Sequence, residues 1–86
     1  MRIRYQQSFI GQFSKLTKSQ KQLAKDAIEL FADNPMHESL RNHPLLDKWS
    51  KYRSITADDD LRLHFRNLDN DVVLFVAVGN NEQLYK

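Results

Sequence analysis

The chain has 86 residues, no cysteine and a formal net charge of +2, with a pI near 9.0. A chain of this length fits one domain, which we assign to residues 1–86, and without cysteine it has neither a disulfide framework nor a zinc–thiolate site. No apolar run approaches the roughly 20 residues that a membrane-spanning helix needs, and the N-terminus lacks the apolar stretch of a signal peptide, so we expect a cytoplasmic protein with no membrane partner.

The first half of the chain has the pattern of one strand and two helices. Residues 2–5 alternate charged and apolar side chains, which is typical of a short strand. Ser8 can then cap a first helix, and Thr17 with Gln20 forms a capping box for a second one. The apolar positions of the two helices recur at helical spacing: Phe9, Phe13 and Leu16, then Leu23, Ala24, Ala27, Ile28, Leu30 and Phe31. Pro35 ends the second helix, so this half predicts a helical hairpin.

The second half of the chain has the pattern of three antiparallel strands. Residues 52–56 suit a strand, and the three aspartates at 58–60 suit a turn. Apolar and polar residues alternate from 61 to 66, and residues 69–71 have the chemistry of a hairpin turn. Residues 72–78 form a continuous apolar run, which is typical of a central strand covered on both faces. The whole order predicts an α+β fold, β-α-α-β-β-β, with both helices on one face of a twisted, mainly antiparallel sheet.

Basic or titratable side chains share one face of the alternating strand. Arg62, His64 and Arg66 point away from the apolar residues between them, and Arg53 on the preceding strand is a further candidate for this face. Arginine grips phosphate oxygens in pairs, and histidine transfers protons near neutral pH. The face is therefore either a phosphate-binding surface or the ordinary solvated side of a one-faced sheet, and the spacing alone favours the solvated side.

Other candidate residues each have two interpretations. His43 precedes a proline in a predicted loop, where the imidazole is either a general acid or base or, as we favour from the residues alone, fixes the loop by a hydrogen bond. Trp49 and Tyr52 either stack on a nucleobase or fill the gap between helix and sheet. The three histidines, which are His37, His43 and His64, do not have metal-ligand spacing, so we expect no metal and no cofactor.

Several segments together resemble one protein family. They are residues 41–45 (RNHPL), 49–55 (WSKYRSI), 61–65 (LRLHF), 72–79 (VVLFVAVG) and the ending LY at 84–85. In this order and spacing they resemble the RelE/ParE toxin superfamily, particularly its YafQ and RelE branches. The resemblance covers nearly the whole chain, including the helical hairpin.

The resemblance implies a fold and a function. RelE and YafQ proteins fold as two helices on a small twisted antiparallel sheet, as the pattern above predicts. They are toxins of bacterial type II toxin–antitoxin systems that enter the A site of the 70S ribosome and cleave mRNA. A cognate antitoxin protein wraps and neutralises each toxin. Cleavage by a ribose 2′-hydroxyl needs a base, cations for the phosphorane charge and an acid for the leaving 5′-oxygen.

The resemblance also implies site residues. His43 matches the histidine of the YafQ His-Pro-Leu motif, and Asp60 falls where YafQ has a functional aspartate. Arg62 matches the arginine with which RelE contacts the phosphate, and Tyr85 matches a C-terminal aromatic near the scissile bond. Asn81 occupies the position of a catalytic histidine in YafQ, so we place it in the site as a hydrogen-bond donor.

For RNA and phosphate binding, the resemblance and the strand face indicate Lys51, Arg53, His64 and Arg66. Arg53 falls in the strand where RelE has basic lysines, and His64 lies beside Arg62. The chain departs from YafQ at Asn81, at Thr56, which replaces a histidine, and at Ala77, which replaces an arginine.

These departures leave two alternatives to a ribosome-dependent endoribonuclease. One is a ParE-like toxin that binds DNA gyrase and has no nuclease activity. The asparagine at position 81 in place of a histidine favours this alternative, whereas the His-Pro-Leu loop disfavours it. The other is a catalytically weakened toxin that persists as an antitoxin-binding protein. If each lost acid or base role is worth roughly 10²–10⁴ in rate, the nuclease activity would be low.

Overall fold

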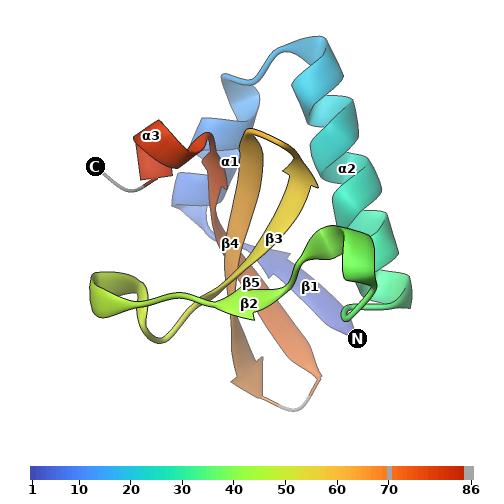
Figure 1. The fold of residues 1–86 in the computed structure, drawn as a ribbon, viewed down its shortest axis with the longest axis vertical. Helices are drawn as coiled ribbons and strands as arrows, with labels where there is room; N and C mark the ends of the chain where they lie inside the picture. The colour runs from blue at the N-terminus through green and yellow to red at the C-terminus, as the bar shows by residue number, and fades with distance from the viewer. Residues whose placement is uncertain (70, 85–86) are drawn as a thin grey trace.

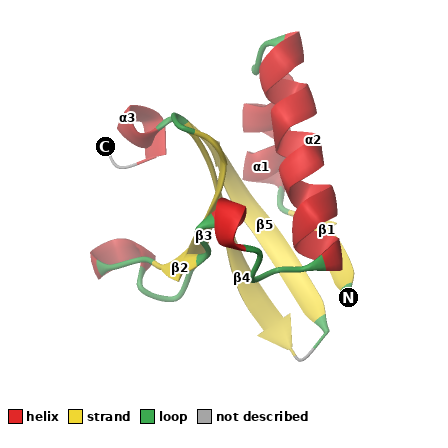
Figure 2. Cartoon of the chain, turned by 45° about the vertical axis from the view of Figure 1, so that its right-hand side comes forward, coloured by secondary structure: helices red, strands yellow, loops and turns green. Residues whose placement is uncertain are grey.

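In a computed structural model, which describes residues 1–69 and 71–84, two helices cover one face of a strongly twisted sheet (Figures 1 and 2). The elements in chain order are β1 (Arg2–Tyr5), α1 (Gln7–Ser14), α2 (Lys18–Asp33), the 3₁₀ turn η1 (Glu38–Leu40), β2 (His43–Pro44), the 3₁₀ turn η2 (Asp47–Trp49), β3 (Arg53–Asp58), β4 (Leu61–Asp69), β5 (Val72–Gly79) and the short helix α3 (Asn81–Leu84). The predicted α+β class and the order of the main elements are confirmed.

The sheet has the strand order β1-β5-β4-β3-β2 within the described residues. Neighbouring strands from β2 to β5 are antiparallel, whereas β1 runs parallel to β5, with Arg4 opposite Leu74. The sheet is therefore mixed, and β1, which the sequence predicted, lies beside the last strand of the chain. The two-residue strand β2 and the helix α3 were not predicted.

Local side chains fix the ends of the two main helices. The predicted capping box is present: the Gln20 amide donates to Thr17 Oγ1 at 3.2 Å, and the Thr17 amide donates to Gln20 Oε1 at 3.0 Å. The prediction that Ser8 caps α1 is wrong, because Gln6 holds the cap position and Ser8 lies inside the helix. The Ser8 hydroxyl instead donates to the Val76 carbonyl at 2.7 Å and so ties α1 to β5. Among residues 1–69 and 71–84, no helix is long and apolar enough to cross a membrane.

The main core lies between the helices and the sheet. Phe31 of α2 packs against Phe65 of β4 and Phe75 of β5, with ring centroids 4.8 and 5.5 Å apart. All three rings are at most 2% exposed. Burying three phenylalanines contributes roughly 1.5–3 kcal/mol each. This core fixes the helix face of the sheet and leaves the opposite face, which we call the outer face, for other contacts.

A second apolar cluster covers part of the outer face. Its buried members are Val76, Ala77 and Leu84, and Trp49, Tyr52 and Leu74 pack against them. A β-bulge explains why consecutive residues of β5 share this face: His64 pairs with Ala77 but Phe65 pairs with Phe75, so Val76 is the extra residue. The prediction that the apolar run at 72–78 is covered on both faces is confirmed, by α1 on one side and by η2 and α3 on the other.

Candidate functional site

The outer face carries a row of residues that crosses four strands. His43 of β2 pairs with Ser54 of β3, Ser54 with His64 of β4, and His64 with Ala77 of β5. Residues directly opposite each other in a sheet point to the same face, so the two histidines share the outer face. Two strand spacings separate their Cα atoms by about 10 Å. The sheet thus brings His43 onto the same face as the predicted basic strand β4, two strands away.

Arginines flank this row on both sides. Arg62 lies between Thr56 of β3 and Gly79 of β5, and Arg66 lies opposite Leu74, which also pairs with Arg4 of β1. Arg62 and Arg66 are half-buried and Arg4 is exposed. Arg4 was missed at the sequence level. Its alternation with apolar neighbours was visible, but only the parallel pairing of β1 with β5 places it on this face.

Backbone carbonyls hold the guanidinium of Arg62 through one of its terminal nitrogens, Nη1. Its Nη1 donates to the carbonyl of Asp58 at 2.5 Å and lies 3.5 Å from the carbonyl oxygen of Leu61. Asp60 is exposed in the adjoining β3–β4 turn, where its backbone amide donates to the Asp58 carboxylate at 3.3 Å. The Arg62 side chain is therefore anchored to the turn that carries Asp60.

His43 presents a defined tautomer to solvent. It is exposed, and its Nδ1 lies 2.8 Å from the carbonyl oxygen of Arg41. A carbonyl oxygen can only accept, so Nδ1 carries the hydrogen, and in the neutral ring Nε2 keeps its lone pair. The hydrogen bond fixes the local chain, as the structural interpretation of the sequence predicted, and it also fixes the orientation of the ring.

His64 is not part of an exposed basic surface, and that prediction is wrong. The side chain is 0% exposed, and the ring of Trp49 lies 4.7 Å away in a T-shaped contact. Burial, and secondarily the neighbouring His43, lowers the pKa of His64 to about 4. The η2 turn brings Trp49 over this part of β4, which the alternation of residues 61–66 did not reveal. At neutral pH His64 is therefore a neutral packing group.

Arg53 does not share the outer face, and its predicted placement is also wrong. It pairs with Phe65, whose ring packs under α2, so Arg53 lies on the helix face. Its Nε donates to Asn42 Oδ1 at 2.8 Å. Side chains two positions apart in a strand share a face, and Ile55, two positions after Arg53, is buried in the main core, so the alternation within β3 already indicated the helix face.

The remaining predicted residues lie around the edge of the outer face or beyond the described chain. Lys51 is exposed in the turn before β3, and Arg66 holds its guanidinium carbon 5.9 Å from the centre of the Tyr52 ring. Asn81 is the exposed first residue of α3 and directly follows the cap residue, Asn80. Tyr85 lies outside the described residues.

Trp49 and Tyr52 are in T-shaped contact at 5.2 Å and pack on the second apolar cluster. They are packing groups, as one interpretation held, but they lie on the outer face and not between the helical hairpin and the sheet. No group of three His, Asp or Glu side chains within the described ranges could hold a metal ion.

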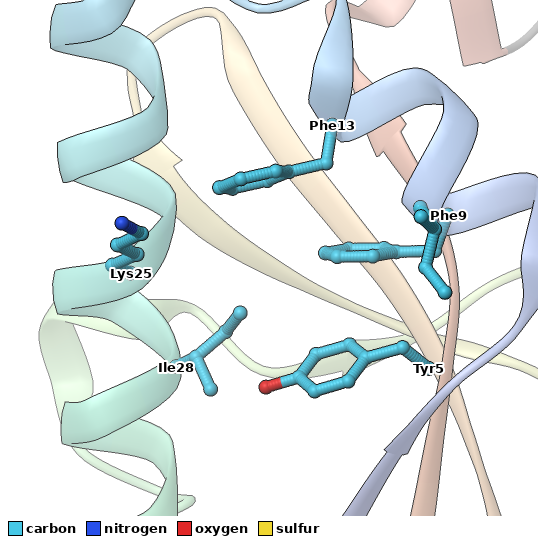
Figure 3. Close-up of a pocket in the computed structure, with 6 residues that line it drawn as sticks. Tyr5, Phe9, Phe13, Lys25 and Ile28 are labelled. Carbon is cyan, nitrogen blue, oxygen red and sulfur yellow. The ribbon is translucent and has the colours of Figure 1, made fainter.

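A separate apolar groove of about 260 Å³ lies between α1 and α2. Figure 3 shows Tyr5, Phe9 and Phe13 on one side, and Ile28 and Lys25 of α2 on the other. The three aromatic rings form a ladder, with centroids 5.3 Å apart for the first pair and 6.0 Å for the second. Because Tyr5 is 43% exposed, the groove presents a considerable apolar surface to solvent.

The comparisons with known proteins define the class of fold. No family model and no curated protein sequence matches the chain. Among solved structures, the YoeB/ParE toxin from Agrobacterium tumefaciens is 14% identical, with a TM-score of 0.76 over 94% of this chain and 99% of that one. The fold is thus that of the RelE/ParE toxins, as the sequence resemblance predicted.

Within that class the fold is similar to YafQ. YafQ from E. coli strain BL21(DE3) is 23% identical, with a TM-score of 0.84 over 100% of both chains. A chain of the E. coli DinJ-YafQ toxin–antitoxin complex is 20% identical, with a TM-score of 0.80 over 98% of this chain and 96% of that one. The YafQ-like fold predicted from the motifs is therefore confirmed.

Proposed function

We propose that this protein is the toxin of a type II toxin–antitoxin system in the bacterial cytoplasm and that it cleaves mRNA in the ribosomal A site. The carrying observation is that His43 and Arg62, from different strands, project from one face of a sheet with the YafQ fold. An imidazole that can accept a proton and a guanidinium on the same face supply two of the three groups that this cleavage needs, the base and the cation.

His43 is proposed as the base. Its Nε2 takes the proton of the ribose 2′-hydroxyl, and the 2′-oxygen attacks phosphorus. The bond from phosphorus to the 5′-oxygen then breaks, which leaves a 2′,3′-cyclic phosphate. The hydrogen bond from Nδ1 to the Arg41 carbonyl supports this role, because it holds the ring in the tautomer that can accept at Nε2.

Arg62 and Arg66 are proposed to hold the phosphate charge. Among the described residues, Nη2 and Nε of Arg62 bond no acceptor and remain open to phosphate oxygens. Lys51 at the edge of the face adds a cation for the RNA chain, and Asn81 donates a hydrogen bond.

The leaving 5′-oxygen also needs a proton. Asn81 cannot supply a proton, so the acid role is left to Asp60, Tyr85 or water. We therefore expect turnover to be roughly 10²–10⁴-fold slower than with a dedicated acid.

The proposed partners are a cognate antitoxin and the 70S ribosome with its mRNA. The groove between α1 and α2 supports the proposal of an antitoxin partner, because its aromatic ladder suits the apolar face of a helix. Lys21, 6.0 Å from the Phe13 ring, and Lys25 add positive charge along one side. The antitoxin segment is therefore proposed to be amphipathic and acidic.

A second candidate is a ParE-like toxin that binds gyrase. Ala77 is buried and Asn81 does not titrate, so two positions that are basic or titratable in YafQ-like sequences supply no catalytic charge here, which favours a function without nuclease chemistry. The third candidate function is that of a weakened toxin that only binds its antitoxin.

Inducible expression in E. coli distinguishes the three candidate functions: nuclease, gyrase-binding toxin and antitoxin-binding protein. The nuclease proposal predicts growth arrest, in-frame cuts in translated mRNA and no DNA-damage response. Arrest with a DNA-damage response and intact mRNA would favour the gyrase target. Normal growth at high expression would favour the antitoxin-binding protein.

A further inference from the structure

A hollow of about 390 Å³ lies on the helix face, between the C-terminal end of α2 and the sheet. Buried side chains of Phe31, Phe65 and Val73 form its apolar floor. Met36, which is 66% exposed, and the half-buried Arg53 stand at its rim. This hollow, which we call the Arg53 hollow, is on the opposite face of the sheet from His43 and Arg62 and has no part in the proposed cleavage.

Arg53 is held in one orientation by a short chain of hydrogen bonds. Its Nε donates to Asn42 Oδ1 at 2.8 Å, and Asn42 Nδ2 donates to the Pro35 carbonyl at 3.0 Å. The Asn42 amide therefore connects the guanidinium to the end of α2. An arginine fixed at Nε loses little further side-chain entropy when it binds a ligand.

The two terminal amino groups of Arg53 are open. Within residues 1–69 and 71–84, neither amino group donates to an acceptor, and no carboxylate forms an ion pair with this guanidinium. The Met1 ammonium, which also lines the hollow, is paired with Asp71 at 3.1 Å. Arg53 thus carries a positive charge beside an apolar floor that nothing in the described chain neutralises.

The chemistry of the hollow selects a carboxylate beside an apolar group. The open edge of a guanidinium matches the two oxygens of a carboxylate. The phenylalanine floor and Met36 suit an apolar side chain next to that carboxylate. A nucleic-acid site would gather several lysines or arginines along the phosphates, whereas Arg53 is the one lysine or arginine side chain that lines the hollow in the described chain.

We propose that the Arg53 hollow binds a segment of a partner protein in which an acidic residue lies beside an apolar one. That the partner is the antitoxin rests on the toxin function proposed above; the site itself does not. The segment places its carboxylate on the terminal nitrogens of Arg53 and its apolar side chain on Phe31 and Phe65.

The test uses the intact chain, ¹⁵N-labelled, and two small probes in solution NMR. 4-Phenylbutyrate carries a ring and a carboxylate, and 4-phenylbutyramide has the same shape without the charge. We expect 4-phenylbutyrate to shift the Arg53 Nε–H and the Asn42 side-chain amide saturably, with a Kd on the order of millimolar for so small a ligand. The amide probe should bind at least about tenfold more weakly.

Two variants and one control make the result specific. Arg53→Gln should abolish the preference for the acid over the amide, and Met36→Ala should weaken both probes. Lys18→Gln removes an exposed positive charge at the start of α2, the end of the helix opposite the hollow, and should leave the binding of both probes unchanged. A dispersed spectrum of each variant establishes that it is folded.

The proposal is overturned if acid and amide bind equally to the parent chain, or if folded Arg53→Gln binds the acid as well as the parent does. It is also overturned if a short single-stranded RNA displaces 4-phenylbutyrate from the hollow, since the site would then belong to nucleic acid. None of these outcomes bears on ribosomal cleavage, so failure of this site and failure of the proposed nuclease are distinguishable.

Discussion

At the scale of single residues, His64 shows that alternation along one strand does not define an exposed surface. Alternation correctly places His64 opposite the main core. It does not show that Trp49, from a turn about fifteen positions earlier, covers that side chain. The helix face of Arg53, by contrast, was indicated by its spacing of two from the apolar Ile55, which is buried in the main core. The placement of Arg62 and Arg66 on the outer face was likewise predictable from the period of two.

The burial of His64 makes stability fall in mild acid. The folded pKa of about 4 lies below the ordinary value near 6.5, so the unfolded chain binds the proton first. Stability is therefore complete above about pH 6.5, falls as the pH drops towards 4, and loses about 2 kcal/mol between pH 7 and 5. The charged or titratable neighbours on this face are His43, Arg62 and Arg66.

Urea unfolding at pH 7 and pH 5 measures this loss. His64→Gln should be less stable at pH 7 but should lose clearly less stability on acidification than the parent chain. Equal pH dependence in the two proteins would mean that His64 titrates in the folded state as it does in the unfolded one.

At the scale of elements, the parts that follow local rules were predictable. The helical hairpin and the Thr17 capping box depend on neighbours within one helical turn. A second local signal was missed: Asn80 and Gln83 have the spacing of a cap, and Gln83 donates its amide to Asn80 Oδ1 at 2.7 Å. The bulge in β5 and the packing of η2 over β4 depend on contacts between distant segments, which local sequence does not reveal. The sequence pattern therefore predicted which residues of β4 share a face and did not show which of those side chains are buried.

The Thr17 capping box is expected to stabilise α2 measurably. Thr17→Ala removes the acceptor for the Gln20 amide and should lower the free energy of unfolding by about 1 kcal/mol. Thr17→Ser keeps the hydroxyl and should restore most of that loss. Chemical denaturation of the three proteins measures the difference. If serine and alanine were equally destabilising, the loss would not come from the cap.

The η2 turn is expected to depend on Trp49 for its place on the sheet. Trp49→Ala removes ring contacts to His64 and Tyr52 and should cost about 2 kcal/mol, less than for a fully buried tryptophan. Leu46→Ala, a matched control at a side chain that is 78% exposed, should change stability by less than about 0.5 kcal/mol. Equal effects of the two changes in thermal unfolding would contradict the packing role of Trp49.

At the scale of the whole molecule, the sheet separates two kinds of surface. The outer face carries the proposed cleavage residues from β2 and β4. The helix face carries the main core, the groove between α1 and α2, and the Arg53 hollow. A partner that occupies the groove or the hollow therefore does not need to touch the cleavage residues directly. This division follows from the alternation along β4, which places Arg62 and Phe65 on opposite faces of the sheet.

The most direct test of the proposed function adds the purified chain to ribosomes programmed with an mRNA whose A site is open, with primer extension to map the cut. Arg62→Ala removes the proposed phosphate contact and should lower cleavage roughly 10²-fold or more, whereas Lys18→Ala, which removes an exposed charge on α2, should leave cleavage as in the parent. We predict a cut in the A-site codon that is absent from free mRNA. No cut with the parent chain in large excess, or equal cleavage by Arg62→Ala, would contradict the proposed site.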